Sequence, residues 1–372
     1  MSGHRPRVAI AHDYLTQRGG AERVVLAMSR AFPDAVIHTT LYEPESTYPE
    51  FRERTVVTSR LNRIGPIRRS HRLGLPLLAM AASSMTVDAD IVLVSSSGWA
   101  HGFGRTGHSL VYCYSPARWI YQSDTYLGGP AVRSAKGLAL LALRPALRRW
   151  DAAAARGADD YVAISRTVQG RIRETYGIEA PVLPAPHSMD AGGSQDPVGE
   201  LEDWADGGYH LVVSRLLPYK NVGVVVDAVR GTGHRLVVVG SGPGRGELLA
   251  TMPHNVRLVS ELSDAQLRWV YAHSRVLVAP SFEDYGLSPL EAAAFGRPSL
   301  TLRAGGYLDT VLEGVTGLHV EAPRPELLRA GLADAAAHPW DPGAIRAHAQ
   351  SFSEAGFAAR LHAEVDHVLA RR

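Results

Sequence analysis

The chain has 372 residues, of which 45% are hydrophobic and 20% charged, with a formal net charge of +2, as is typical of a globular protein large enough for two cores. Its single cysteine, Cys113, excludes a disulfide framework and a cysteine-rich metal site, and its apolar neighbours predict a buried thiol. The longest apolar runs are too short to span a membrane and the amino terminus lacks a signal-peptide pattern, so we expect a cytoplasmic protein.

Short apolar runs alternate with helical patterns along the whole chain. Residues 21–32, 221–230 and 263–274 show helical periodicity, and runs rich in β-branched residues predict buried strands. This alternation predicts an α/β protein with two doubly wound, Rossmann-like parallel sheets, whose ligands bind beyond the carboxyl ends of the strands in a central cleft. The expected strands are residues 7–12, 35–40, 90–96, 109–115 and 159–165 in the first half, and 209–214, 234–240, 256–260, 275–281 and 297–303 in the second.

Residues 281–298, SFEDYGLSPLEAAAFGRP, place two carboxylates eight residues apart around a glycine. Glu283 follows a predicted strand directly, so it is either solvated or available to a polar ligand. Glu291 has a local explanation, because Ser288 and Glu291 form the pattern of a helix capping box. The backbone N–H groups of residues 286–290, at the predicted helix start, favour an anion such as a diphosphate.

The segment from Phe282 to Val320 resembles the signature of the retaining family 4 glycosyltransferases, which have the GT-B fold. Further segments resemble the same family at the expected intervals, so the resemblance covers nearly the whole chain. It implies four parts: an acceptor-side domain, a linker, a nucleotide-sugar-binding domain and a final helix that crosses back to the first domain. The segments that carry the resemblance are HDYLTQRGGAERVV, WDAAAARGADDYVAISRTVQGRI, SRLLPYKNVGVVVDA, VVVGSGPG and FSEAGFAARLHAEV. The corresponding boundaries are 1–190, 191–208, 209–353 and 354–372.

The resemblance assigns roles to charged residues of the second half. Arg215 and Lys220 match the family's diphosphate-binding pair, Glu283 the glutamate near the donor sugar, and Glu291 the one that binds the ribose. Preorganised cations suit a leaving group whose negative charge grows in the transition state. In this family the acceptor is thought to attack on the face that the leaving group vacates, although a covalent intermediate is an alternative. The other donor-side residues expected in this half are Gly242, Tyr285, Gly286, Leu287 and Ser288.

Candidate residues of the first half lie after predicted strands. Gly19 and Gly20 would let the backbone approach a phosphate or sugar closely, or would serve only a turn. His12, Asp13, His101 and Arg118 are candidates for the acceptor side. A structural role is equally open for His12 and Asp13, which lie at the end of a predicted strand.

Two positions depart from the family's pattern. Tyr114 stands where related sequences usually carry a histidine that contacts the donor sugar, so either the geometry differs or the role has moved to His101. Asp309 stands where the family tends to have glutamate. Both departures leave the sugar undetermined.

Two motifs point to other chemistry but lack its context. The sequence Asp88-Ala89-Asp90 matches the D-x-D of metal-dependent transferases, yet it precedes a predicted strand, which favours a turn role at the opposite edge of the sheet. The glycines of residues 240–244 lack dinucleotide-binding spacing. We therefore expect no metal and no cofactor other than a nucleotide-sugar co-substrate.

These observations predict a metal-independent, retaining hexosyltransferase that uses a UDP- or GDP-sugar donor and an unknown hydroxyl acceptor, with no nucleic-acid partner. A sugar-nucleotide 2-epimerase and a catalytically inactive GT-B-like binding protein are the alternatives. The acceptor could belong to a glycan, a glycolipid or a natural product.

Charge is distributed unevenly along the chain. Residues 1–185 hold 23 Lys and Arg against 15 Asp and Glu, whereas the remainder holds 16 against 22. Much of the basic excess lies in residues 59–74 and 143–150. The pattern favours the anionic inner face of a membrane as a partner of these basic segments. The alternative is that they form an ordinary solvated surface.

Overall fold

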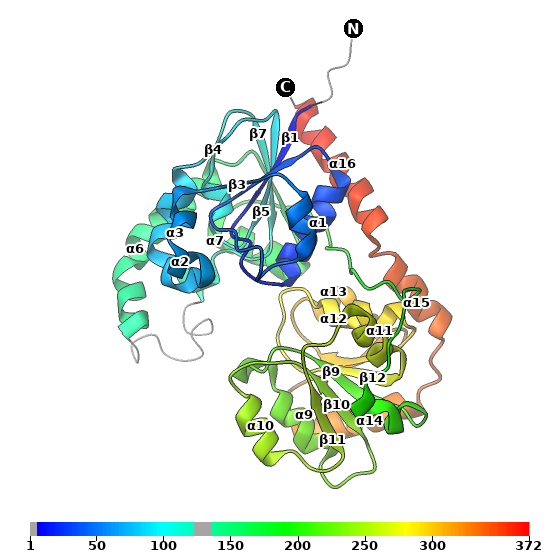
Figure 1. The fold of residues 1–372 in the computed structure, drawn as a ribbon. Helices are drawn as coiled ribbons and strands as arrows, with labels where there is room; N and C mark the ends of the chain where they lie inside the picture. Colours follow the sequence, from blue (N-terminus) through cyan, green and yellow to red (C-terminus); the bar gives the residue numbers. More distant parts are fainter. Residues whose placement is uncertain (1–5, 123–134, 372) are drawn as a thin grey trace. The chain divides into compact units, whose positions relative to one another are not determined.

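The computed structural model describes residues 6–122 and 135–371 (Figure 1). The chain divides into two compact units, Met1–Pro186 with Glu354–Arg372, and His187–Ser353. The change of unit at residue 187 precedes the predicted linker 191–208. That segment belongs to the second unit, because its apolar side chains Val198, Leu201 and Trp204 are buried in that unit's core.

The first unit is built on a six-stranded parallel sheet with the order β3-β2-β1-β5-β7-β8. The order reverses between β1 and β5, where His12 lies opposite Ser95 at the carboxyl ends of the two strands. Such a reversal is where ligands of doubly wound sheets bind. The strands are β1 (Val8–His12), β2 (Val36–Thr39), β3 (Val56–Thr58), β5 (Ile91–Ser96), β7 (His108–Cys113) and β8 (Asp160–Ala163), and β4 (Thr86–Val87) pairs separately with β6 (Gly104–Arg105).

Helices cover this sheet and extend beyond it. The carboxyl-terminal helix α16 (Glu354–Ala370) packs beside α1 (Gly20–Ala31) and against β7, as Figure 1 shows. An ion pair between Arg30 and Glu354 and an edge contact of the Tyr112 and Phe357 rings join these elements. The other α-helices among the described residues of this unit are α2 (Gly65–Arg69), α3 (Leu75–Ser83), α4 (Arg118–Tyr121), α6 (Ala135–Arg156), which contains Pro145, and α7 (Arg166–Tyr176).

The second unit repeats this architecture with the sheet order β11-β10-β9-β12-β13-β14, again parallel throughout. Alternate residues of β10 belong to different hydrophobic cores on the two faces of the sheet. Leu236 and Val238 share one core with residues of α9 and α14. Val237 and Val239 share the other core with residues of α8 and α11. Burial on both faces explains why the strands read as continuous apolar runs. The strands are β9 (Tyr209–Val213), β10 (Leu236–Val239), β11 (Val256–Val259), β12 (Ser274–Ala279), β13 (Ser299–Leu302) and β14 (Gly317–Val320).

The helices of the second unit follow the strands in alternation. Ser263 and Gln266 form a capping box at the start of α11, within the range 263–274 that the helical periodicity predicted. The helices are α8 (Glu202–Ala205), α9 (Val222–Val229), α10 (Arg245–Thr251), α11 (Asp264–Ala272), α12 (Leu287–Ala294), α13 (Tyr307–Thr310), α14 (Pro325–Ala337) and α15 (Pro342–Gln350).

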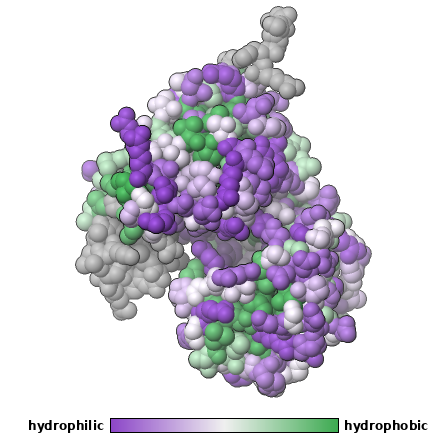
Figure 2. All heavy atoms as spheres, viewed as in Figure 1, coloured by the Kyte–Doolittle hydropathy of each residue, from purple (hydrophilic) through white to green (hydrophobic). Residues whose placement is uncertain are grey.

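Surface and interior follow the expected chemistry. Cys113 is buried, as its apolar neighbours predicted. In the described part of the chain, no helix combines the length and hydrophobicity needed to cross a bilayer. Hydrophilic residues cover most of the visible face of each unit, and hydrophobic residues occur there in smaller groups (Figure 2).

Candidate active site

Glu283 and Lys220 form an ion pair at the carboxyl edge of the second sheet. The Lys220 ammonium lies 2.5 Å from Glu283 Oε1, and the Ser281 hydroxyl donates a hydrogen bond of 2.8 Å to the same oxygen. Both side chains are mostly buried, at 15% and 20% exposure. The two loops meet because β9 and β12 are neighbours in the sheet. The structure therefore brings together two of the residues predicted for catalysis.

Asn221 joins these two loops through its side chain. Its backbone is left-handed, with φ 56°, at the turn between Lys220 and helix α9. Its Nδ2 donates a hydrogen bond of 2.9 Å to the backbone oxygen of Pro280. Sequence reasoning assigned no role to Asn221, although asparagine tolerates this backbone conformation better than most residues.

Helix α12 begins at Leu287, directly after Gly286, whose φ is 96°. A Cβ atom at Gly286 would lie 2.5 Å from the Tyr307 ring, so only glycine fits both the conformation and the space. The predicted capping box of Ser288 and Glu291 is therefore wrong, because the helix starts before Ser288. Its first backbone N–H groups lack partners within the helix and suit an anion.

Glu291 is held by a tyrosine. Its Oε2 accepts a hydrogen bond of 2.6 Å from the Tyr271 hydroxyl, which leaves the other carboxylate oxygen for a further donor. This contact between α11 and α12 replaces the local role that the capping pattern suggested.

A pair of glycines supports the Glu283 loop from behind. The N–H of Gly306 donates a hydrogen bond of 2.8 Å to the backbone oxygen of Glu283. A Cβ at Gly305 would lie 2.2 Å from that oxygen, and one at Gly306 would lie 2.3 Å from the Cα of Tyr285. Close backbone contact thus explains why glycines occupy positions 305 and 306.

Arg215 lies on the loop after β9, which also carries Lys220, and is exposed. No hydrogen bond or ion pair of its guanidinium occurs within residues 6–122 and 135–371. Gly242, with φ 148°, packs against the same loop, since a Cβ there would lie 2.7 Å from the Leu216 backbone oxygen. The two predicted donor-side positions are therefore neighbours.

In the first unit, Asp13 organises the backbone after β5. Its carboxylate accepts hydrogen bonds from the N–H groups of Ser97 (2.6 Å), Trp99 (3.1 Å) and Ala100 (2.6 Å). Asp13 is only 2% exposed, so its carboxylate has the structural role that the sequence left open beside an acceptor-side one.

His12 and Tyr114 share a buried hydroxyl. His12 Nδ1 lies 2.9 Å from Ser95 Oγ, which lies 2.9 Å from the Tyr114 hydroxyl, and the latter donates a 3.2 Å hydrogen bond to the Ala21 backbone oxygen. Burial lowers the pKa of His12 and raises the pKa of Tyr114. The structure thus places the Tyr114 hydroxyl among protein partners, whereas the sequence pattern suggested a donor-facing position.

The glycine loop of the first unit covers a buried carboxyl group that sequence reasoning missed. Gly19 precedes α1, and a Cβ there would lie 2.5 Å from Glu22 Oε2. Glu22 is 1% exposed, and this burial raises its pKa to about 7, against hydrogen bonds from Gln17 and backbone N–H groups. Its position in the first helical turn was the available signal, because carboxylates are favoured there.

His101 belongs to an internal polar network. Its Nδ1 lies 3.1 Å from Ser96 Oγ and its Nε2 lies 3.0 Å from Asp151 Oδ1, while Tyr121 and Tyr176 donate hydrogen bonds to Asp151 Oδ2. His101 is 4% exposed, so these contacts hold its ring inside the first unit. Arg118, the other acceptor-side candidate, is exposed at the start of α4.

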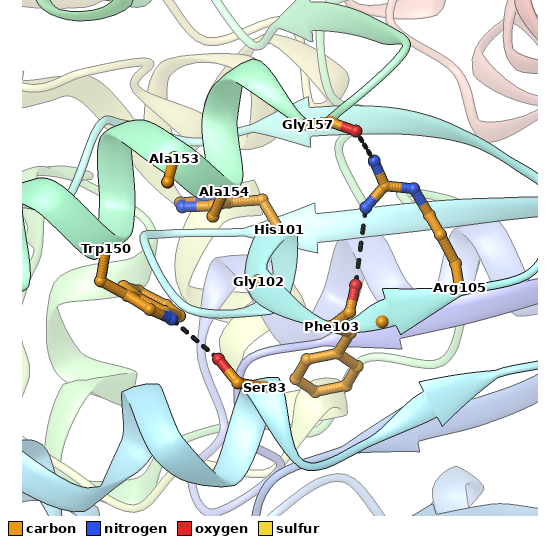
Figure 3. A pocket seen from close by; sticks show the side chains of 10 residues that line it. Ser83, His101, Gly102, Phe103, Arg105, Trp150, Ala153, Ala154 and Gly157 are labelled. Atoms are coloured by element: carbon orange, nitrogen blue, oxygen red, sulfur yellow. Dashed lines mark hydrogen bonds between the residues drawn. The ribbon is translucent and has the colours of Figure 1, made fainter.

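His101 also lines a pocket of about 320 Å³ between α6 and the chain that leads into β6 (Figure 3). Trp150 donates a 2.8 Å hydrogen bond to Ser83 across one side, and Arg105 donates to the Gly157 and Phe103 backbone oxygens on the other. The Trp150 and Arg105 side chains that line this pocket are thus hydrogen-bonded to other groups of its wall.

The D-x-D sequence lies at the amino end of β5. Asp88 pairs with Arg7 at 3.1 Å and accepts a hydrogen bond from Thr106, and Asp90 accepts one from the Arg7 N–H. This is the turn role expected from the sequence. Within the described ranges, no group of three or more His, Cys, Asp or Glu residues could hold a metal ion.

Comparisons with known proteins agree with this architecture. Residues 18–190 match the model described as Glycosyltransferase Family 4, and residues 205–356 match that of Glycosyl transferases group 1. The D-rhamnosyltransferase WbpZ of Pseudomonas aeruginosa is 29% identical over 168 residues, covering 42% of this chain and 41% of that protein. The D-inositol 3-phosphate glycosyltransferase of Corynebacterium glutamicum is 30% identical over 174 residues, covering 40% and 41%. The matched parts thus span about two fifths of each relative.

Solved structures resemble the whole chain. Anabaena HepE in complex with UDP-glucose has a TM-score of 0.69 at 14% identity, covering 97% of this chain and 100% of that one. Sucrose-phosphate synthase from Thermosynechococcus elongatus has a TM-score of 0.72 at 16% identity, covering 98% and 100%. The chain therefore belongs to the group 1, family 4 glycosyltransferases and has the GT-B fold.

Proposed function

We propose that the protein is a retaining, metal-independent glycosyltransferase that moves a hexose-like sugar from a UDP- or GDP-sugar to a hydroxyl acceptor. The observation that carries this proposal is the Lys220–Glu283 pair, with Ser281 on the same carboxylate oxygen, in the unit that also holds the start of α12. An amine and a carboxylate at one strand edge offer a cation for the leaving diphosphate and an acceptor for sugar hydroxyls.

The cations would act on the leaving group. Lys220 and Arg215 follow the same strand, β9, so a diphosphate bound there would meet two positive charges. The N–H groups at the start of α12 would add a third source of positive potential. Charge that develops on the diphosphate oxygens would then be stabilised without a metal ion.

The carboxylates would orient the donor. Glu283 already has its Oε1 bonded by Lys220 and Ser281, so Oε2 can accept a hydrogen bond from a sugar hydroxyl. Glu291, held by Tyr271, would accept from the ribose. Holding each carboxylate by a second side chain reduces the entropy lost when the donor binds.

The solved structures of HepE with UDP-glucose, and with UDP and glucose, support a uridine nucleotide as the first donor to test. The curated relatives are named for different reactions, among them D-rhamnosyl transfer and glycogen synthesis. The acceptor is therefore proposed only as a hydroxyl group.

A donor screen tests the proposal. Thermal shift with UDP and GDP identifies the base, since a ligand that binds only the folded state raises its stability. Release of that nucleoside diphosphate from candidate sugar donors, with and without simple hydroxyl acceptors, then measures turnover. Lys220→Ala should abolish release, and the matched control Arg324→Ala, at a 62% exposed arginine of the same unit, should not.

The outcomes separate the three functions considered. Acceptor-dependent release with retention at the anomeric carbon supports the transferase. Conversion of a UDP-sugar to its 2-epimer without an acceptor would instead support the epimerase. Nucleotide binding without turnover of any donor would support an inactive binding protein.

A further inference from the structure

Two segments of the first unit contain arginines and no acidic residue. Residues 59–87 hold five Arg, and the described part of α6 up to Trp150 holds one Lys and three Arg. The fold brings these segments together, because Leu78 of α3 and Leu147 of α6 share a buried cluster. The Trp150 ring also donates a 2.8 Å hydrogen bond to Ser83. We name the surface of residues 60–83 and 141–150 the basic apolar face.

Large apolar side chains are exposed on the basic apolar face. Met80 is 63% exposed and Leu73 is 58% exposed. Of the eleven large hydrophobic side chains exposed among the described residues, five lie on this face: Ile64, Leu73, Leu77, Met80 and Leu143. Figure 2 shows hydrophobic residues beside hydrophilic ones where α3 and α6 lie in Figure 1.

The positive charges on the same face are largely uncompensated. Arg68 pairs with Glu43 at 2.9 Å. The exposed arginines Arg60, Arg63, Arg69, Arg148 and Arg149 have no ion pair within the described parts of the chain. Arg148 lies over the Tyr121 ring, with its guanidinium carbon 5.3 Å from the ring centroid. Arginines without an acidic partner around protruding aliphatic side chains favour a partner that is both anionic and apolar.

We propose that the basic apolar face binds the surface of a bilayer that contains anionic lipids. Leu73, Leu77 and Met80 would enter the boundary between headgroups and acyl chains, and the arginines would contact lipid phosphates. Single-stranded nucleic acid fits less well, because it binds through stacked aromatic side chains and the exposed apolar residues here are aliphatic. The inference does not depend on the proposed transfer reaction, since the face lies outside the Lys220–Glu283 site.

Cosedimentation with vesicles tests this proposal on the full chain. One vesicle is phosphatidylcholine alone and the other contains roughly 30% phosphatidylglycerol, each at low and at high NaCl. Binding should occur to the anionic vesicle at low salt and fall at least tenfold at high salt, because salt screens the charges. Each arginine near the surface should contribute roughly fivefold to the partition coefficient.

Two sets of variants separate the apolar and the charged contributions. Leu73→Ser with Met80→Ser should weaken binding at least tenfold, as should Arg60→Gln with Arg63→Gln and Arg69→Gln. The controls are Leu249→Ser, at a 45% exposed leucine of the other unit, and Arg324→Gln, and both should bind like the parent. Circular dichroism and thermal unfolding confirm that each variant is folded.

Three results would overturn the proposal: no binding of the parent to anionic vesicles at low salt, equal binding to the neutral vesicle, or unchanged binding of both folded face variants. If the parent binds an acidic protein or RNA but neither vesicle, the face serves another class of partner. Nucleotide binding in the second unit should be the same in all variants, so failure here leaves the proposed function intact.

Discussion

Glu22→Gln is expected to change how the stability of the first unit depends on pH. Burial raises the pKa of Glu22 from 4.5 to about 7 in the folded protein, whereas the unfolded chain keeps the ordinary value. Between these values the folded state binds a proton that the unfolded state has released. Because the pKa is raised on folding, the contribution of Glu22 is greatest below pH 4.5 and is lost as the pH rises to about 7.

The shift sets the size of the effect. Each pKa unit corresponds to about 1.4 kcal/mol, so the difference amounts to about 3 kcal/mol of unfolding free energy. Glutamine does not titrate and can accept the same hydrogen bonds from Gln17 and the backbone. The free energy of unfolding of Glu22→Gln relative to the parent should therefore rise by about 3 kcal/mol between pH 4.5 and pH 7.5. Asp13 and Tyr114, the other titratable groups that face Glu22, are present in both proteins.

Urea unfolding followed by tryptophan fluorescence at several pH values between 4.5 and 7.5 measures this difference. The first unit contains Trp99, Trp119 and Trp150, and its transition is fitted separately if the two units unfold in steps. Glu45→Gln is the control, since Glu45 is 81% exposed. A difference between Glu22→Gln and the parent that stays constant with pH would refute the reasoning.

Three further predictions concern the site. Glu283→Gln should lower kcat while nucleotide affinity, measured by calorimetry, stays roughly unchanged, whereas Glu291→Gln should weaken nucleotide binding by about 1–3 kcal/mol; full activity of Glu283→Gln would contradict its assignment. EDTA should leave initial rates nearly unchanged, and a large loss restored by Mn²⁺ or Mg²⁺ would show that a metal takes part. Tyr114→Phe should lower the free energy of unfolding by about 1 kcal/mol through lost hydrogen bonds to Ser95 and Ala21, with little change in kcat/KM. A tenfold loss of kcat/KM at normal stability would place the hydroxyl on the sugar.

Ten of the twelve strands of the two large sheets could be predicted from the sequence, whereas the short edge strands β3 and β14 could not. Parallel strands buried on both faces require unbroken apolar runs, and such runs mark β1, β5 and β7 as clearly as β9, β10 and β12. The same alternation predicted that Lys220 and Glu283 follow strands. The 2.5 Å distance between Lys220 Nζ and Glu283 Oε1, however, depends on the sheet order that makes β9 and β12 neighbours.

Local motifs were less reliable where a distant contact competed with them. The S-x-x-E pattern predicted that Ser288 caps α12, but Gly286 adopts φ 96° against the Tyr307 ring and the helix begins at Leu287. Glu291 then bonds Tyr271, a residue of another helix. A capping pattern specifies only one compatible geometry, and packing against α13 selected a different one.

For the buried residues Tyr114 and Glu22 of the first unit, the sequence by itself determined where each lies along its strand or helix and which chemical group it carries. It placed Tyr114 at the end of β7 and Glu22 in the first turn of α1. Only the tertiary structure decided that Tyr114 bonds Ser95 and Ala21 and that Glu22 is buried beneath Gly19. Burial and hydrogen-bond partners come from segments far apart in the chain, and it is this combined environment that displaces a pKa or engages a hydroxyl group.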